Sequence, residues 1–115
     1  MQSRDKLSKK EQEVLVLDLV NALVACQNMS ETALFLQDLL TMKEMKNLAK
    51  RLRIAKLLLS GMTYEQIEEK LHVSHGTVAK IAAWLTERGD GFRKVIEKMP
   101  EQQNEVANEK YSEWD

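Results

Sequence analysis

Residues that interrupt helices are scarce in this sequence, and this scarcity constrains the fold more than any other feature. The 115 residues include one proline and four glycines, too few for the frequent turns of an all-β fold. Apolar residues recur every three or four positions over most of the chain, which is the period of an amphipathic helix. We therefore predict an all-α protein of six helices, at a length that suits a single domain.

Short capping sequences indicate where these helices begin. Ser8 to Glu11, Thr41 to Glu44 and Thr63 to Gln66 each place a Ser or Thr three residues before a Glu or Gln, which is the pattern of a capping box. Ser30 and Ser74 are expected to cap the second and fifth helices through their hydroxyl groups. Together these residues predict where five of the six helices start.

The ends of the helices are predicted from glycine and proline. Gly61 is expected to end the third helix in the left-handed conformation, which glycine adopts without strain. Gly89 to Gly91 should separate the fifth helix from the sixth, and Pro100 should stop the sixth. The first helix is expected to reach about Cys26, the second to cover 31–40, the fifth to reach about Arg88 and the sixth to cover 92–99.

The first two predicted helices carry more apolar residues than one packed face buries. These residues are Val14, Leu15, Leu17, Leu19, Val20, Leu23 and Val24, then Leu34, Phe35, Leu36, Leu39 and Leu40. A second copy of the chain would cover the excess, and a twofold dimer is the commonest such arrangement. The alternative is that the helices cover each other within one chain. We predict the homodimer.

Opposite charges gather in two segments, although the formal net charge is only -1. Residues 43–56 include six lysines and arginines but one acid, whereas the residues from Glu97 onward include six acids but two lysines. We predict that 1–99 form the helical domain and that 100–115 form an acidic, disordered tail. A solubilising role for the tail is favoured over an interaction with a partner.

Several functional classes find no support in the sequence. Cys26 is the only cysteine, so no intrachain disulfide or thiolate metal cluster is expected. The most apolar stretch, 14–24, contains polar residues and is too short to span a bilayer. His72 and His75 are the only histidines, and neither a glycine-rich phosphate loop nor a nucleophile elbow is present. We predict a soluble cytoplasmic protein with no enzymatic activity, metal, cofactor or membrane partner.

The segment 63–88 predicts a helix-turn-helix, in which the second helix enters the major groove of DNA. Its two helices would share an apolar core, with Val73 placed in the turn as a plug that fixes their crossing angle. The core residues are expected to be Ile67, Leu71, Val73, Val78, Ile81 and Leu85. The alternative is an ordinary pair of packed helices, and the Ser74 cap together with the apolar turn favours DNA binding.

The opposite face of the second helix carries the residues that we expect to contact DNA. They are small or polar: Ser74, His75, Gly76, Thr77, Ala79 and Lys80. Small residues let a helix approach base edges closely, and Thr77 has both a hydroxyl and a methyl group to offer. His75 is expected to donate to guanine or a phosphate, and Lys80 to reach a phosphate or guanine. The free N–H groups at the start of this helix suit a phosphate oxygen.

One feature opposes this interpretation. Glu65, Glu68 and Glu69 fall on the exposed side of the first helix of the pair, where they would repel phosphates. The basic residues of 43–56, with Arg51 among the expected DNA contacts, offset them if that face meets DNA. The alternative is that these basic residues only form a solvated surface.

The chain resembles the Trp repressor family, and more closely the Trp-repressor-related YerC/YecD proteins, over roughly its first hundred residues. The matching positions are Leu40-Thr41, Arg51 to Ile54, Leu58 to Thr63, Ile67, Leu71 and Thr77-Val78. The resemblance implies a six-helix bundle and an intertwined homodimer whose outer helices interlock. It also implies two reading helices about one DNA turn apart, ~34 Å.

The resemblance also locates a possible effector pocket, at Thr41, Arg51, Lys80, Ile81 and Trp84. Thr41 and Arg51 match residues of the family's tryptophan site. Lys80 replaces a second stacking arginine, although a lysine lacks the planar group that stacks on an indole. Ile81 and Trp84 are bulky side chains where the family has a glycine and a serine. We therefore predict that L-tryptophan is not bound in the family's manner.

These observations predict a sequence-specific DNA-binding transcriptional regulator, acting as a repressor on double-stranded DNA. The alternative is a helical protein-interaction module of the transcription machinery that does not read DNA itself. The sequence identifies neither the operator nor a small-molecule effector.

Overall fold

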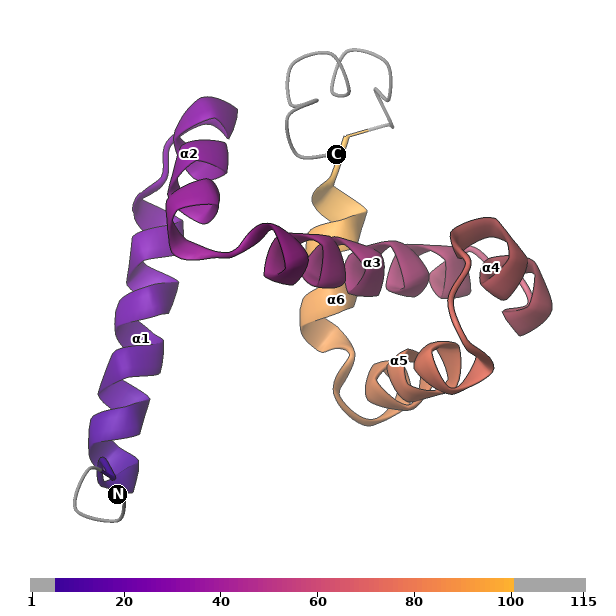
Figure 1. The fold of residues 1–115 in the computed structure, drawn as a ribbon, viewed down its shortest axis with the longest axis horizontal. Coiled ribbons are helices and arrows are strands. Elements are labelled where there is room, and N and C mark those ends of the chain that lie inside the picture. The colour runs from indigo at the N-terminus through magenta and orange to yellow at the C-terminus, as the bar shows by residue number, and fades with distance from the viewer. Residues whose placement is uncertain (1–5, 101–115) are drawn as a thin grey trace. The chain divides into compact units, whose positions relative to one another are not determined.

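The computed structural model describes residues 6–100 of the chain. Its contacts divide the chain after Thr41 into two compact units. Six helices and no strand are found over 6–100 (Figure 1), so the all-α prediction is confirmed. None of these helices combines the length and the apolar character that crossing a bilayer requires. The tail expected after Pro100 lies outside the described residues.

The N-terminal unit contains α1 (Lys9–Ala25) and α2 (Met29–Leu39). The predicted capping box opens α1: the Glu11 amide donates to Ser8 Oγ at 3.0 Å, and the Ser8 amide donates to Glu11 Oε1 at 2.8 Å. The predicted cap of α2 is wrong. Asn28 caps the helix by accepting the Glu31 amide on Oδ1 at 2.9 Å, and Ser30 lies inside it, because an asparagine side chain caps as well as a serine.

The apolar surface of the N-terminal unit is largely uncovered. Ala33 is its only buried residue among those described. The large apolar side chains of α1 are exposed, from 41% for Leu23 to 77% for Val24. This unit by itself therefore buries too little apolar surface to form a core of its own.

The C-terminal unit contains α3 (Met42–Leu59), α4 (Tyr64–Leu71), α5 (His75–Arg88) and α6 (Asp90–Lys98). The long helix α3 contacts each of the other three, and α5 contacts α4 and α6. This packing holds α4 and α5 at fixed positions on α3 (Figure 1).

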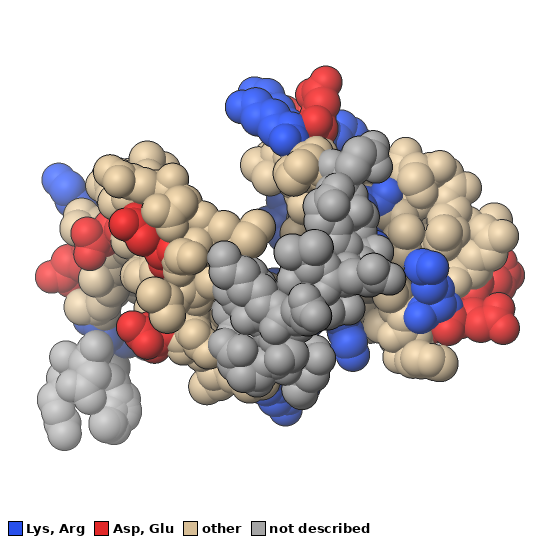
Figure 2. Space-filling view, turned by 90° about the horizontal axis from the view of Figure 1, so that it is seen from above, with Lys and Arg blue, Asp and Glu red and all other residues tan. Residues whose placement is uncertain are grey.

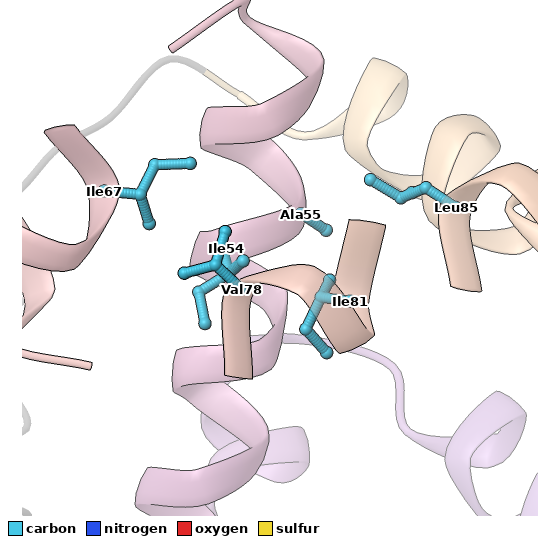
Figure 3. Packing of buried hydrophobic residues seen from close by; sticks show 6 residues of the cluster. All are labelled: Ile54, Ala55, Ile67, Val78, Ile81 and Leu85. Carbon is cyan, nitrogen blue, oxygen red and sulfur yellow. The ribbon is translucent and has the colours of Figure 1, made fainter. Parts of the chain in front are cut away.

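A compact apolar core holds the C-terminal unit together. Side chains from α3, α4 and α5 converge in it (Figure 3), and the buried members are Ile54, Ala55, Ile67, Val78, Ile81 and Leu85. Leu71 and the turn residue Val73 are half-buried against the same cluster. The core predicted for the helix-turn-helix is therefore confirmed, and α3 supplies its remaining buried side chains.

The connections in this unit are tight. Gly61 has φ +93°, as predicted for the end of α3. His72 ends α4 in the left-handed region, with φ 55° and ψ 48°, which the sequence did not predict. The predicted break at 89–91 is too long, because Gly89 alone separates α5 from α6. The helix α6 starts at Asp90 rather than at Phe92, where an acid in the first turn suits the helix dipole.

Candidate nucleic-acid interface

The two helices of the candidate interface begin at side-chain caps. Thr63 Oγ1 accepts the Gln66 amide at 3.2 Å, and Gln66 Oε1 accepts the Thr63 amide at 3.0 Å, which completes the capping box of α4. Ser74 Oγ accepts the Thr77 amide at 3.1 Å at the start of α5. The hydroxyl groups of Ser74 and Thr77 also lie 2.9 Å apart, within hydrogen-bond distance. Both predicted caps are confirmed.

The turn between α4 and α5 is short and well packed. The left-handed His72 ends α4, and the Val73 amide donates to the Glu68 carbonyl at 3.3 Å. Val73 then packs against the core, in the position that the sequence predicted. The turn consequently sets the angle of α5 relative to α4.

One face of α5 is buried and the other is open to solvent. Val78, Ile81 and Leu85 point into the core. The residues predicted to contact DNA lie elsewhere on the helix: Ser74, His75, Gly76, Thr77 and Lys80 are exposed, and Ala79 is half-buried. The first turn of α5 thus presents small and polar groups on a fixed support.

His75 is held by α4. Its Nδ1 lies 2.8 Å from Glu68 Oε2, and its ring lies 5.5 Å from the ring of Tyr64, centroid to centroid. Sequence reasoning missed this contact, because Glu68 and His75 are seven residues apart and meet only through the left-handed turn. Of the three glutamates expected to repel phosphates, Glu68 is therefore engaged with His75.

A hollow lies between α3 and the first half of α5, with a volume of about 300 Å³. We call it the α3–α5 hollow; it is lined by Asn47, Lys50, Arg51, Ile54, Val73, Thr77, Lys80 and Ile81. Three of these side chains are cationic and no carboxylate from the described residues lines the hollow. It therefore suits an anionic group such as a phosphate.

The predicted effector-pocket residues do not all gather in this hollow. Arg51, Lys80 and Ile81 line it, but Ile81 is buried in the core. Thr41 is the last residue of the N-terminal unit. Trp84 is half-buried, and its ring is approached by three cations at centroid distances of 5.6 Å for Arg51, 5.8 Å for Lys80 and 4.6 Å for Arg88. The indole of Trp84 thus contacts both cations expected to hold an effector.

Acidic residues remain beside the candidate interface. Glu65 and Glu69 of α4 are exposed, and Figure 2 shows acidic side chains gathered over the part of the C-terminal unit where α4 lies, beside lysine and arginine side chains. No group of three or more potential metal ligands occurs among residues 6–100. Charge here is therefore mixed on α4 and positive along the α3–α5 hollow.

Comparison with known proteins identifies the family. The family model described as Trp repressor protein matches residues 15–100. The chain belongs to the Trp repressor family. This is a family of helical DNA-binding regulators and not of enzymes.

Two relatives agree with this assignment. The "Uncharacterized protein YerC" of Bacillus subtilis is 29% identical over 104 residues, which are 90% of this chain and 96% of that protein. A solved structure, that of a TrpR-like protein from Eubacterium eligens, is similar with a TM-score of 0.71 and 28% identity. The match covers 79% of this chain and 94% of that one. The predicted resemblance and fold are confirmed.

Proposed function

We propose that this protein is a sequence-specific transcriptional repressor of the cytoplasm that reads the major groove of double-stranded DNA with α5. The proposal rests on the first turn of α5. Its side chains are small or polar and exposed to solvent, while the opposite face of the helix packs in the core. Such a surface enters a major groove without steric obstruction. Repression then requires only that the bound protein occlude a promoter.

The surroundings of α5 support docking against the DNA backbone. Lys50, Arg51 and Lys80 line the α3–α5 hollow next to the reading face, and each cation that meets a phosphate contributes to affinity by releasing counterions. The amides of His75 and Gly76, in the first turn of α5, have no carbonyl partner within the helix and suit a phosphate oxygen. Arg51 would thus contact the DNA backbone rather than a base.

The active form that we propose is a homodimer joined through α1. The large apolar side chains of α1 are exposed, because the N-terminal unit by itself does not cover them. One face of α1, which includes Val16, Leu17 and Val20, is apolar and exposed and would pack against apolar side chains of a partner. A twofold axis would place two copies of α5 in successive major grooves, ~34 Å apart.

Selection from a random pool of duplexes tests the reading helix. The wild type should enrich one twofold-symmetric sequence, and its affinity should fall steeply as salt rises, because several phosphates are contacted. The double variant Thr77→Ala/Lys80→Ala should lose the preference and bind about 10- to 100-fold more weakly. Lys94→Ala, on α6, removes an exposed lysine outside the proposed interface and is the matched control.

Two outcomes of the selection would contradict the proposal. If the double variant keeps the same preferred sequence as the wild type, α5 is not the reader. If the wild type enriches no sequence and shifts no duplex at low salt, the protein is not a sequence-specific DNA-binding protein.

A second candidate is a helical module that binds another protein of the transcription machinery. The observation that favours it is the pair of exposed acids Glu65 and Glu69 on α4, which would lie near phosphates if α5 docked in the groove. A protein-interaction module should show neither sequence preference nor steep salt dependence on duplex DNA. The selection experiment therefore separates the two functions.

We further propose that L-tryptophan is not the effector. Arg51 and Lys80 already contact the indole of Trp84, and Ile81 fills the core beneath them. Calorimetric titration of the full chain with L-tryptophan should give no saturable heat at micromolar concentrations. Saturable micromolar binding would overturn this proposal.

A further inference from the structure

The contact between Glu68 and His75 fixes which nitrogen of the imidazole carries a proton. An ionised carboxylate has no hydrogen to donate and accepts only. Glu68 Oε2 lies 2.8 Å from His75 Nδ1, so Nδ1 carries the hydrogen and donates it. In a neutral imidazole the other nitrogen, Nε2, is then a hydrogen-bond acceptor.

His75 lies where its Nε2 atom is accessible to a ligand. His75 is the first residue of α5, and its side chain is 70% exposed. The only hydrogen bond of its ring to the described residues is the one at Nδ1. The Tyr64 ring, tilted by 52° to the imidazole at 5.5 Å, limits the freedom of the ring further. In the neutral imidazole, Nε2 is therefore an acceptor held in a defined direction at the start of the reading helix.

We propose that Glu68 is a positioning residue that sets His75 to read an exocyclic amino group on a base edge. In the major groove these groups are N4 of cytosine and N6 of adenine, whereas guanine offers only acceptors there. A phosphate oxygen also only accepts, so Nε2 in this state does not pair with the DNA backbone. This inference rests on the proposed function, and it differs from the sequence-based expectation that His75 donates to guanine or phosphate.

The tautomer is measured on the free protein by nitrogen-15 NMR of the imidazole rings at pH 8. The chain has two histidines, so in the variant His72→Gln the only imidazole signals are those of His75. We expect the neutral form with the proton on Nδ1, and we expect Glu68→Ala to shift the proton toward Nε2. Glu69→Ala, which removes the neighbouring exposed acid, should leave the tautomer unchanged. A wild-type ring that is protonated on Nε2 at this pH overturns the proposal without bearing on DNA binding.

The base preference is measured by selecting duplexes with the wild type and three variants. We expect the wild type to favour cytosine or adenine at one position of each half-site by about 5- to 10-fold, the discrimination of one base contact. His75→Ala should lose the preference at that position alone. Glu68→Ala should relax it or turn it toward guanine, whereas Glu69→Ala should alter affinity for all sequences alike.

The possible results distinguish a failure of this inference from a failure of the proposed function. If selected sequences appear but Glu68→Ala leaves every position unchanged, Glu68 does not position the reader and the inference fails alone. If His75→Ala changes no position, His75 is not a reader. If the wild type selects no sequence, the base-reading inference falls together with the proposed function, while the NMR result still decides the tautomer.

Discussion

The two units of this chain are built from the same kind of helix but differ in what covers their apolar residues. In the C-terminal unit, Ile54, Ile67 and Val78 are fully buried and come from three different helices. In the N-terminal unit, Ala33 is the one buried residue among those described. One unit completes its core within the chain, and the other does not.

This difference indicates where we propose that a partner binds. Apolar surface that stays in water costs free energy in proportion to its area, and an exposed apolar face of this extent marks an interaction surface. The proposed sites of DNA reading and of subunit association are thus separated along the chain. We expect substitutions in the N-terminal unit to affect association of the subunits. We expect substitutions in the C-terminal unit to affect folding and DNA contact.

The largest effect is expected from a charge placed on α1. Leu17 is 59% exposed, and Leu17→Asp would bury a carboxylate at the proposed dimer contact without a partner. We expect the dimer dissociation constant to rise by about 100-fold or more, equivalent to ~3 kcal/mol, as measured by sedimentation equilibrium. The matched control is Asp18→Asn, which changes a charge by one unit on the opposite side of α1, where Asp18 is exposed. Unchanged dimerisation of the Leu17 variant would show that this face of α1 is not the interface.

An effect of comparable size but of a different kind is expected from the core of the C-terminal unit. Ile54 is 0% exposed, and Ile54→Ala should lower the free energy of unfolding by about 2–5 kcal/mol through lost burial and a residual cavity. Leu48 of the same helix is 44% exposed, so Leu48→Ala should cost clearly less. Chemical denaturation of both variants gives the comparison. Equal costs would mean that Leu48 is covered in the protein in solution.

The smallest effect is expected from the helix caps, which occur in both units in the same form. Thr63→Ala removes the capping box of α4 and Ser8→Ala that of α1, and each should cost about 1 kcal/mol. The Thr63 variant should show this loss in the unfolding of the C-terminal unit, followed by hydrogen exchange in α4. The Ser8 variant should leave α4 unaffected and increase exchange at the start of α1. A loss that spreads to both helices would mean that the two units unfold together.

Much of the fold follows from local patterns that the sequence displays directly. The capping boxes at Ser8 and Thr63, the left-handed Gly61 and the apolar positions of α4 and α5 depend only on residues a few positions apart. The errors arise where two local signals compete. Asn28 and Ser30 are both good caps, and the sequence alone did not rank them. Glycines at 89 and 91 both suggest a break, but only Gly89 interrupts the helices.

The candidate site was less predictable, because its geometry depends on residues brought together by packing. The exposed face of α5 was predicted from helical period alone. The α3–α5 hollow requires the packing of α3 against α5, and the contact of Glu68 with His75 requires the left-handed turn at His72. A non-glycine residue in that conformation is uncommon, so nothing in the sequence indicated it.

The compact connection between α4 and α5 has a kinetic consequence. Only three residues, His72 to Ser74, join the two helices. The amides of His72 and Val73 donate to the Glu68 carbonyl, Val73 packs against the core, and Ser74 caps α5. If the motif binds a duplex as we propose, the connection between α4 and α5 does not have to become ordered, and binding costs little additional conformational entropy. The rate of association with DNA is then set by diffusion, orientation and charge. This rate should therefore fall as ionic strength rises, and no slow ordering step of a loop should limit it.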